Sequence, residues 1–231
     1  MKRICIIPAR GGSKRIPGKN IKDFLGKPIV AYSIEAALKS GVFDEVMVST
    51  DDETIAEVAR KYGASVPFLR SEKTSDDYAT TADVIREVLE RYREKGVCYD
   101  AICCLYATAP FVTAEKLRDA AGIIDEGEFD SAFTCVAFSY PVLRGLEINE
   151  RGRIEMRWPE YRDSRSQDLP KIYHDAGQFY FATVAAFERA GSLWGDNTAP
   201  IVVSELEVQD LDTPEDWKIA EMKCIARGAK H

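Results

Sequence analysis

Short apolar runs alternate with amphipathic segments over residues 1–135. Four runs have the length and composition of buried strands: Ile4-Ile7, Val46-Ser49, Ala101-Leu105 and Ser131-Val136. Between them, apolar residues recur at the i, i+3, i+4 spacing of a helix that buries one face: Val30/Ile34/Ala37/Leu38, Ile55/Val58/Ala59/Tyr62, Val84/Ile85/Val88/Leu89/Tyr92 and Leu117/Ala120/Ala121/Ile124. The alternation predicts a series of βαβ units.

Residues at the ends of these segments support the same helices. Thr50-Asp51-Asp52-Glu53 and Thr80-Thr81-Ala82-Asp83 have the composition of capping boxes, and glycines follow the helical stripes at positions 41, 63, 96 and 127. A βαβ series predicts an α/β fold with a Rossmann-like, mainly parallel sheet and helices on both faces. Ligands of such folds bind in a crevice at the carboxyl ends of the strands.

The alternation stops from about Phe138 to Lys171. This stretch is rich in Pro, Gly and charged residues, including the loop 162–168, and it predicts a hairpin-like excursion. The α/β pattern then resumes with strands at Gln178-Ala182 and Ile201-Val203, and Thr213-Pro214 opens a last helix. We therefore expect residues 1–231 to form a single domain with an excursion at about 138–171.

Composition narrows the class of partner. The chain has 231 residues, is 45% hydrophobic and 30% charged, and carries a formal net charge of -7, which excludes a globally basic nucleic-acid surface. The charge is unevenly distributed, because residues 1–30 hold eight Lys/Arg and one acidic residue, Asp23. A cationic pole on an acidic protein suggests a bound polyanion.

Other features of the sequence argue against secreted proteins, membrane proteins, zinc sites and serine-hydrolase triads. The apolar run before Pro8 is too short for a signal peptide, and no run approaches a membrane span, so we expect a cytoplasmic protein without membrane partners. The six cysteines include no C-x-x-C pair, and most are expected to be buried, reduced thiols. The chain has only two histidines, His174 and His231, so it offers few residues for a zinc site or a Ser-His-Asp triad.

A basic glycine loop follows the first predicted strand, with the sequence Pro8-Ala9-Arg10-Gly11-Gly12-Ser13-Lys14-Arg15-Ile16-Pro17-Gly18-Lys19-Asn20. Glycines let backbone N–H groups approach an anion, and four cations within the loop can offset the charge of a triphosphate. The spacing is not that of a Walker A loop, and G-x-G-x-x-G is absent. The alternative is a solvated basic turn. Because the loop is polar, we expect it to lie outside the core, so that replacing Arg10 or Lys19 leaves the fold intact.

A second candidate is Asp210-Leu211-Asp212, which comes just before the last helix. In an extended segment its two carboxylates lie on one face. Paired hard oxygens suit Mg²⁺, which keeps several waters and shares its other positions with phosphate oxygens. The alternative is that Asp212 only caps the helix or favours its N-terminal dipole.

The loop resembles the signature of the CMP-sialate synthetases, carried here by Pro8-Ala9-Arg10-Gly11-Gly12-Ser13-Lys14-x-Ile16-Pro17-x-Lys19-Asn20. The resemblance runs from Ile4 to the last helix. It implies a fold that binds CTP and an attack by the anomeric hydroxyl of a keto-sugar acid on the α-phosphorus, with release of pyrophosphate. It implies nucleotide contacts from Ala9, Arg10, Gly11, Gly12, Ser13, Lys14, Lys19, Asn20, Arg70, Thr80 and Thr81. The alternative role for Thr80 and Thr81 is that they only cap a helix.

The same resemblance implies the metal site and the assembly. Asp210 and Asp212 would hold Mg²⁺ as the cofactor, and with Arg10 and Lys19 they form the implied catalytic set. Arg165-x-Gln167-Asp168-Leu169-Pro170 resembles the family's sugar-acid stretch, with Ser166 in place of an arginine. A homodimer is implied, in which the excursion packs on the partner and reaches its active site.

Two segments depart from the sialate branch of this family: Tyr106-Ala107-Thr108-Ala109-Pro110-Phe111 and Tyr173-His174-Asp175-Ala176-Gly177-Gln178-Phe179-Tyr180. Both are similar to the branch that uses pseudaminic acid, a nonulosonic acid. The expected partners are therefore CTP and a nonulosonic acid, with sugar contacts from Tyr106, Thr108, Tyr140, Arg165, Gln167, Gln178 and Phe179. The alternative for Tyr106 and Phe179 is that they are aromatic residues of the core and do not contact the sugar. N-acetylneuraminate, legionaminate or Kdo remain alternative sugars, and a nucleotide-binding regulator without turnover is the alternative to an enzyme.

Overall fold

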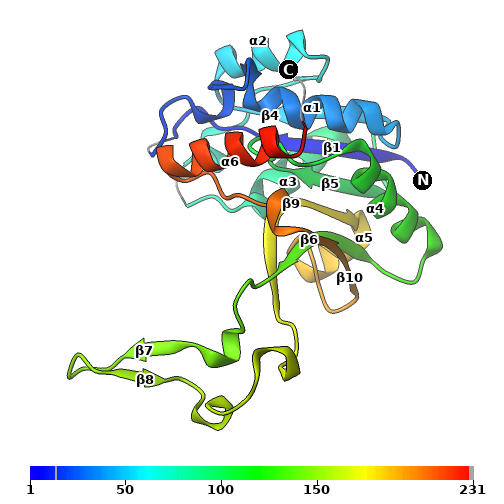
Figure 1. The fold of residues 1–231 in the computed structure, drawn as a ribbon. Helices are drawn as coiled ribbons and strands as arrows, with labels where there is room; N and C mark the ends of the chain where they lie inside the picture. Colours follow the sequence, from blue (N-terminus) through cyan, green and yellow to red (C-terminus); the bar gives the residue numbers. More distant parts are fainter. Residues whose placement is uncertain (14, 77, 229–231) are drawn as a thin grey trace.

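The computed structural model describes residues 1–13, 15–76 and 78–228 (Figure 1). Its centre is a six-stranded sheet with the strand order β10-β6-β9-β5-β1-β4. The strands are β1 (Arg3–Pro8), β4 (Glu45–Ser49), β5 (Ala101–Leu105), β6 (Ser131–Ala137), β9 (Tyr173–Thr183) and β10 (Thr198–Val203). β1 is parallel to β4 and β5, and β10 is parallel to β6, whereas β9 runs antiparallel between β5 and β6. The predicted mainly parallel sheet is confirmed.

Helices cover both faces of this sheet, as the alternation of apolar runs and amphipathic segments predicts. They are α1 (Ile29–Ser40), α2 (Glu53–Lys61), α3 (Thr81–Glu94), α4 (Ala114–Glu126), α5 (Val184–Ala190) and α6 (Pro214–Ala226). Side chains of α1, α2 and α4 form one core cluster with alternate residues of β1 and β5, such as Cys5 and Leu105. The intervening residues, such as Ile6 and Ile102, pack with α3 and α5 on the opposite face. Alternate residues of each strand therefore pack into two cores, one on each face of the sheet.

A third apolar cluster holds the C-terminal segment against the basic loop. Trp217, on α6, contacts Phe24 edge to face at 5.5 Å between ring centroids, and the cluster also contains Ile16 and Leu211. Phe24 lies on β2 (Asp23–Phe24), which pairs with β3 (Lys27–Pro28). Segments far apart in sequence, residues 16–29 and 211–224, are thus packed together.

The segment between β6 and β9 leaves the body of the molecule, as Figure 1 shows. It contains a two-stranded hairpin of β7 (Leu146–Ile148) and β8 (Ile154–Met156). Its apolar side chains are largely exposed, with Ile148 at 74% and Ile154 at 69%.

Most predicted boundaries are confirmed. Thr80 caps α3 with a complete capping box, and Thr213 does the same for α6. Two expectations were wrong. Asp52, not Thr50, caps α2, because the helix begins at Glu53 and the carboxylate of Asp52 accepts from the first free N–H groups. Leu38 is 44% exposed, because it lies at the margin of the buried stripe of α1.

The six cysteines all lie in the described part of the chain and form no disulfide there, and five of them are buried. This confirms the expectation that most are buried, reduced thiols. No described helix combines the length and the apolar composition needed to cross a membrane.

Candidate active site

Two cavities adjoin at the carboxyl ends of β1 and β5. The first, of about 480 Å³, is here called the basic cavity; it is lined by Pro8, Arg10, Ser13, Arg15, Lys19, Asn20, Arg70, Thr74, Asp76, Ala79, Thr81, Val84 and Tyr106. The second cavity, of about 500 Å³, is lined by Tyr106, Thr108, Val136, Ala137, Ser139, His174, Asp175, Ala176, Gly177, Glu205, Val208, Gln209, Asp210, Leu211 and Lys223. Tyr106 lines both, so this side chain marks their boundary.

The loop that follows β1 is anchored at several points. Ile16 is only 3% exposed, and the Asn20 amide donates to the carbonyl oxygen of Arg10 at 2.9 Å. Gly11 donates its N–H to Asp51 at 2.9 Å, and a Cβ at Gly11 would lie 2.8 Å from the Asp52 carboxylate. The expectation that this loop lies outside the core was wrong, because Ile16 belongs to the third apolar cluster.

Lys19 connects the loop to the Asp210-Leu211-Asp212 segment. Its Nζ donates to the Leu211 carbonyl oxygen at 2.8 Å and lies 3.8 Å from Asp212 Oδ1. Arg15 also pairs with the Asp212 carboxylate. Burial lowers the pKa of Lys19, although Asp212 and Asp210 oppose that shift. Both carboxylates are thus close enough to Lys19 to influence its charge.

Two guanidinium groups add positive charge to the basic cavity. Arg70 donates to the carbonyl oxygen of Ser49 at 2.5 Å and to its hydroxyl at 3.2 Å, at the end of β4. Burial lowers the pKa of Arg70, while Asp51 and Glu87 act in the opposite direction. Arg10 Nη1 donates to the carbonyl oxygen of Asp76 at 3.2 Å. Backbone acceptors therefore orient both groups along a wall suited to an anion.

The structure assigns different positions to the two threonines before α3. The Thr80 hydroxyl accepts from the Asp83 N–H at 3.2 Å and donates to the Asp83 carboxylate at 2.6 Å, so capping uses its hydrogen-bonding capacity. Thr81 is the first residue of α3 and lines the basic cavity together with Tyr106. Thr80 therefore acts as the cap of α3, whereas Thr81 faces the basic cavity.

Asp210 and Asp212 flank Leu211, which is 1% exposed and packed in the third apolar cluster. Asp210 lines the second cavity, and Asp212 lies beside the basic loop. Carboxylate oxygens are hard ligands of the kind that Mg²⁺ prefers, and this ion commonly shares its other positions with phosphate oxygens and water. Among the described residues, no group of three or more Asp, Glu, His or Cys side chains is placed to hold a metal.

Several predicted residues lie away from the cavity walls. The Ala9 side chain is fully buried, and its N–H donates to the Ser49 carbonyl oxygen at 2.9 Å. Phe179 is fully buried in the core between the sheet and helices α1, α2 and α4. Gln178 is 3% exposed, and its amide donates to the Glu207 carbonyl oxygen. Gly12 is exposed in the loop, and Lys14 lies outside the described residues.

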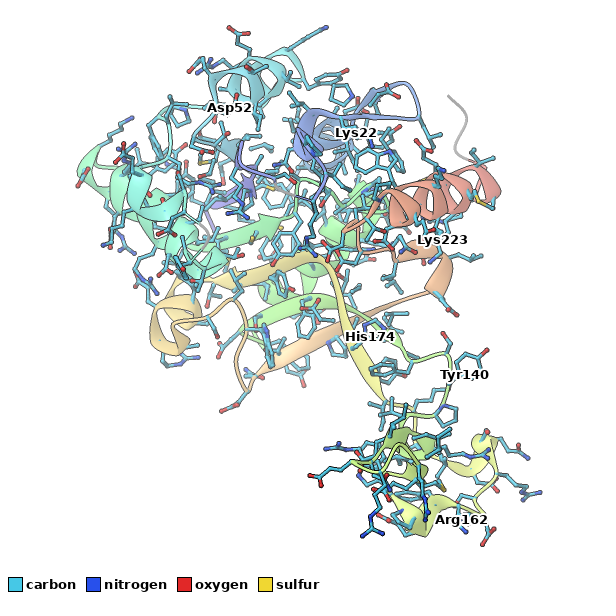
Figure 2. The ribbon with its side chains drawn as sticks, turned by 90° about the vertical axis from the view of Figure 1, so that its left-hand side faces the viewer. Lys22, Asp52, Tyr140, Arg162, His174 and Lys223 are labelled. Carbon is cyan, nitrogen blue, oxygen red and sulfur yellow. The ribbon has the colours of Figure 1, made fainter. Side chains whose placement is uncertain are left out.

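Three predicted sugar contacts belong to the excursion instead. Tyr140 is 85% exposed where the excursion leaves the sheet. Arg165 and Gln167 lie farther out, where Arg165 pairs with Asp168 at 2.9 Å. Figure 2 shows the nearby Arg162 at the far end of the excursion, well away from His174 at the second cavity. Neither cavity of this chain includes these residues.

Asp175 and Lys223 line the second cavity, although the sequence predicted neither as a site residue. Asp175 comes from the first part of β9, and Lys223 comes from α6. Lys223 Nζ donates to the carbonyl oxygens of Val208 at 2.6 Å and Glu205 at 3.1 Å, which fixes the segment before Asp210. No local pattern signals these roles, because each depends on a contact between distant elements.

Comparison with known proteins gives a consistent set of matches. A family described as Cytidylyltransferase matches residues 4–143. The chain is 46% identical over 222 residues to the pseudaminic acid cytidylyltransferase of Campylobacter jejuni subsp. jejuni, with 96% of each chain covered. It is 34% identical over 228 residues to the CMP-N,N'-diacetyllegionaminic acid synthase of Legionella pneumophila, covering 96% and 95% of the two chains. The solved structure of CMP:2-keto-3-deoxy-manno-octonic acid synthetase complexed with CTP matches with a TM-score of 0.70 and 21% identity, over 100% of each chain.

Proposed function

The chain belongs to the cytidylyltransferase family, and we propose that it transfers CMP from CTP to the anomeric hydroxyl of pseudaminic acid, with release of pyrophosphate. The observation that carries this proposal is the pair of adjoining cavities that share Tyr106 as a wall. A nucleotide in one cavity and a sugar acid in the other would meet at that wall. There the anomeric oxygen could form its bond to the α-phosphorus while the bond to pyrophosphate breaks.

The basic cavity suits the nucleotide. Arg10, Arg15, Lys19 and Arg70 line it, and a triphosphate is the ligand whose charge such a set can balance. Both Arg10 and Lys19 are oriented by backbone carbonyl oxygens before any ligand binds. Such preorganisation favours catalysis of phosphoryl transfer, in which positioning and charge stabilisation dominate.

Asp210 and Asp212 are the residues that would hold Mg²⁺. The bound ion would neutralise charge on the transferring phosphoryl group and on the departing pyrophosphate. Asp212 pairs with Arg15 and Lys19, and both of these cations line the basic cavity. The lining of the second cavity by Asp210 and the pairing of Asp212 with two cations of the basic cavity support this role.

Pseudaminic acid is the favoured sugar because relatives named for it are 46% identical to this chain, compared with 34% for the legionaminic acid relative. The second cavity also has apolar wall segments beside its polar ones. Val136, Ala137, Ala176 and Val208 contribute apolar surface, which accepts methyl and acetyl groups. A sugar that carries additional hydroxyls would leave them without hydrogen-bond partners against this apolar surface, and its transition state would bind more weakly.

The excursion supports a homodimer in which each chain completes the other's sugar site. Arg165 and Gln167 resemble carboxylate-binding residues but lie on the excursion, which projects away from the cavities of their own chain (Figure 2). The exposed apolar side chains of β7 and β8, including Leu146 at 63%, also suit burial against a partner. A second copy of this chain would provide both the surface and the site for these groups.

The test is a pyrophosphate-release assay with pseudaminic acid and each of CTP, ATP, GTP and UTP. We expect release with CTP and Mg²⁺ that stops when EDTA is added and returns when excess Mg²⁺ is restored. A nucleotide-binding regulator would bind CTP in a parallel calorimetric titration and release no pyrophosphate. Release with every nonulosonic acid except pseudaminic acid would retain the enzyme class and reject the sugar.

A further inference from the structure

The second cavity has one strongly cationic side chain in its wall. Lys223, which comes from α6 (Figure 2), is the only lysine or arginine among the described residues that line this cavity. Three carboxylates, those of Asp175, Glu205 and Asp210, line the same cavity. A sugar acid that enters here therefore meets several groups that repel its negative charge and one ammonium group that attracts it.

The ammonium group of Lys223 is held by neutral acceptors. Its Nζ donates to the carbonyl oxygens of Val208 at 2.6 Å and Glu205 at 3.1 Å. Within the described part of the chain, no carboxylate forms an ion pair with Lys223. An ammonium group carries three hydrogens, so the two backbone contacts leave one donor for a ligand. The positive charge also remains without a counterion from this chain.

The carboxylates nearby are occupied by other donors. Asp175 accepts from the Gly177 N–H at 2.7 Å, and Glu205 accepts from the Ser139 hydroxyl at 2.6 Å. Each carboxylate is therefore stabilised without Lys223. The ammonium group is thus fixed in direction by carbonyl oxygens, and its remaining capacity is available to an anion in the cavity.

Lys223 also lies on the side of the second cavity that Asp210 lines. Val208, whose carbonyl oxygen accepts from Lys223, comes two residues before Asp210. Two residues span at most about 7 Å of chain, so the ammonium group is placed near the candidate metal pair. This is the part of the second cavity that would adjoin the reacting phosphate.

The chemistry of the substrate brings its negative charge to the same place. In a nonulosonic acid, the carboxylate is bonded directly to the anomeric carbon, which also carries the attacking hydroxyl. When that hydroxyl meets the α-phosphorus, the carboxylate necessarily lies close to the phosphates, and the two anionic groups repel each other. A cation beside the carboxylate offsets this repulsion and lowers the cost of removing the carboxylate from water.

We propose that Lys223 binds the carboxylate of the sugar acid through its remaining N–H and its charge. The inference rests on the proposed function, because it assumes that the sugar occupies the second cavity. It holds for any nonulosonic acid, since all of them carry this carboxylate. A carboxylate can accept several hydrogen bonds, so Lys223 and the Arg165 of a second copy of this chain can bind it together.

The experiment measures how strongly the protein prefers the carboxylate to an uncharged group of the same shape. Pyrophosphate release with saturating CTP and Mg²⁺ gives kcat/KM for pseudaminic acid and for its primary amide, in the parent and in Lys223→Met. The parent should prefer the acid. In Lys223→Met the ratio of the two kcat/KM values should fall about tenfold or more, equivalent to ~1.4 kcal/mol. Because both substrates are measured on one variant, a general loss of stability cancels from the ratio.

Lys116→Met is the matched control. Lys116 is a lysine of similar setting, because its Nζ bonds to the Glu207 carboxylate at 2.9 Å and to the Phe111 carbonyl oxygen at 3.3 Å, beside the same 205–208 segment. It lines neither cavity, so its loss should leave the ratio of acid to amide unchanged. Lys223→Gln is the second test variant, because its amide can still donate to a carbonyl oxygen but carries no charge. It should lose the preference for the acid as Lys223→Met does.

The outcomes separate this inference from the proposed function. Should the parent release no pyrophosphate with CTP and any nonulosonic acid, the proposed function fails, and the role of Lys223 fails with it. If the parent is active, an unchanged ratio of acid to amide in both Lys223 variants would overturn the inference alone and leave Lys223 a residue that only holds the 205–208 segment. An equal fall of the ratio in Lys116→Met would also overturn it.

Discussion

Replacing Lys19 with Met tests whether one cation both binds phosphate and holds the site together. The substitution keeps the length of the side chain but removes the bond to the Leu211 carbonyl oxygen at 2.8 Å and the charge 3.8 Å from Asp212. A hydrogen bond from a charged group contributes about 1.5–3 kcal/mol, so the free energy of unfolding should fall by that amount. Losing a phosphate contact of similar strength should weaken CTP binding roughly 10- to 150-fold.

The assays are urea denaturation for the unfolding free energy and calorimetric titration with CTP for affinity. Arg15→Met is the matched control, because Arg15 also pairs with Asp212 but its side chain is 67% exposed, compared with 21% for Lys19. An exposed pair contributes little, so the control should lose less than about 1 kcal/mol of stability. The reasoning is refuted if Lys19→Met binds CTP like the parent, or if both variants lose the same stability.

Three other predictions follow from the site and its surroundings. Asp210→Asn combined with Asp212→Asn should abolish pyrophosphate release without unfolding the protein by circular dichroism, and ordinary Mg²⁺-dependent activity in the double variant would show that the pair is structural. Burial opposes ionisation of Glu207, but its bonds to Lys116 and Ser204 outweigh burial and lower its pKa to about 2. The stabilisation from this carboxylate is therefore present above its unfolded pKa and lost as the pH falls toward 2, so the stability of Glu207→Gln should lack this acid loss in a pH titration. Light scattering should give twice the chain mass of 25.8 kDa at micromolar concentration, and a monomer would contradict the shared sugar site.

The strands and helices were predictable because their signals are local. Ala101–Leu105 has the bounds that the sequence predicts, and the stripe from Val84 to Tyr92 lies buried on α3. The antiparallel direction of β9 was not predictable, because it depends on the return of the chain from the excursion. Sequence reasoning found the second half of that strand, Gln178-Ala182, but not its beginning at Tyr173.

The site was only partly predictable for the same reason. Glycines and cations identified the loop after β1, and the spacing of Asp210 and Asp212 identified the carboxylate pair. Contacts across the fold were not visible in the sequence: Lys19 contacts Leu211 across 192 positions. Asp175 and Tyr180 meet because the ladder between β6 and β9 shifts register between Phe133 and Cys135, which a period-two pattern cannot reveal.

The choice of pseudaminic acid as the sugar that this cytidylyltransferase activates can be tested directly. The most direct measurement is a competition assay in which one reaction holds CTP, Mg²⁺, pseudaminic acid and N-acetylneuraminate at equal concentrations, with both CMP-sugars quantified by mass spectrometry. The ratio of initial products gives the ratio of kcat/KM for the two sugars. We predict that CMP-pseudaminate exceeds CMP-N-acetylneuraminate by at least about tenfold, equivalent to ~1.4 kcal/mol in transition-state binding. Equal amounts of the two products, or an excess of CMP-N-acetylneuraminate, would contradict the assignment.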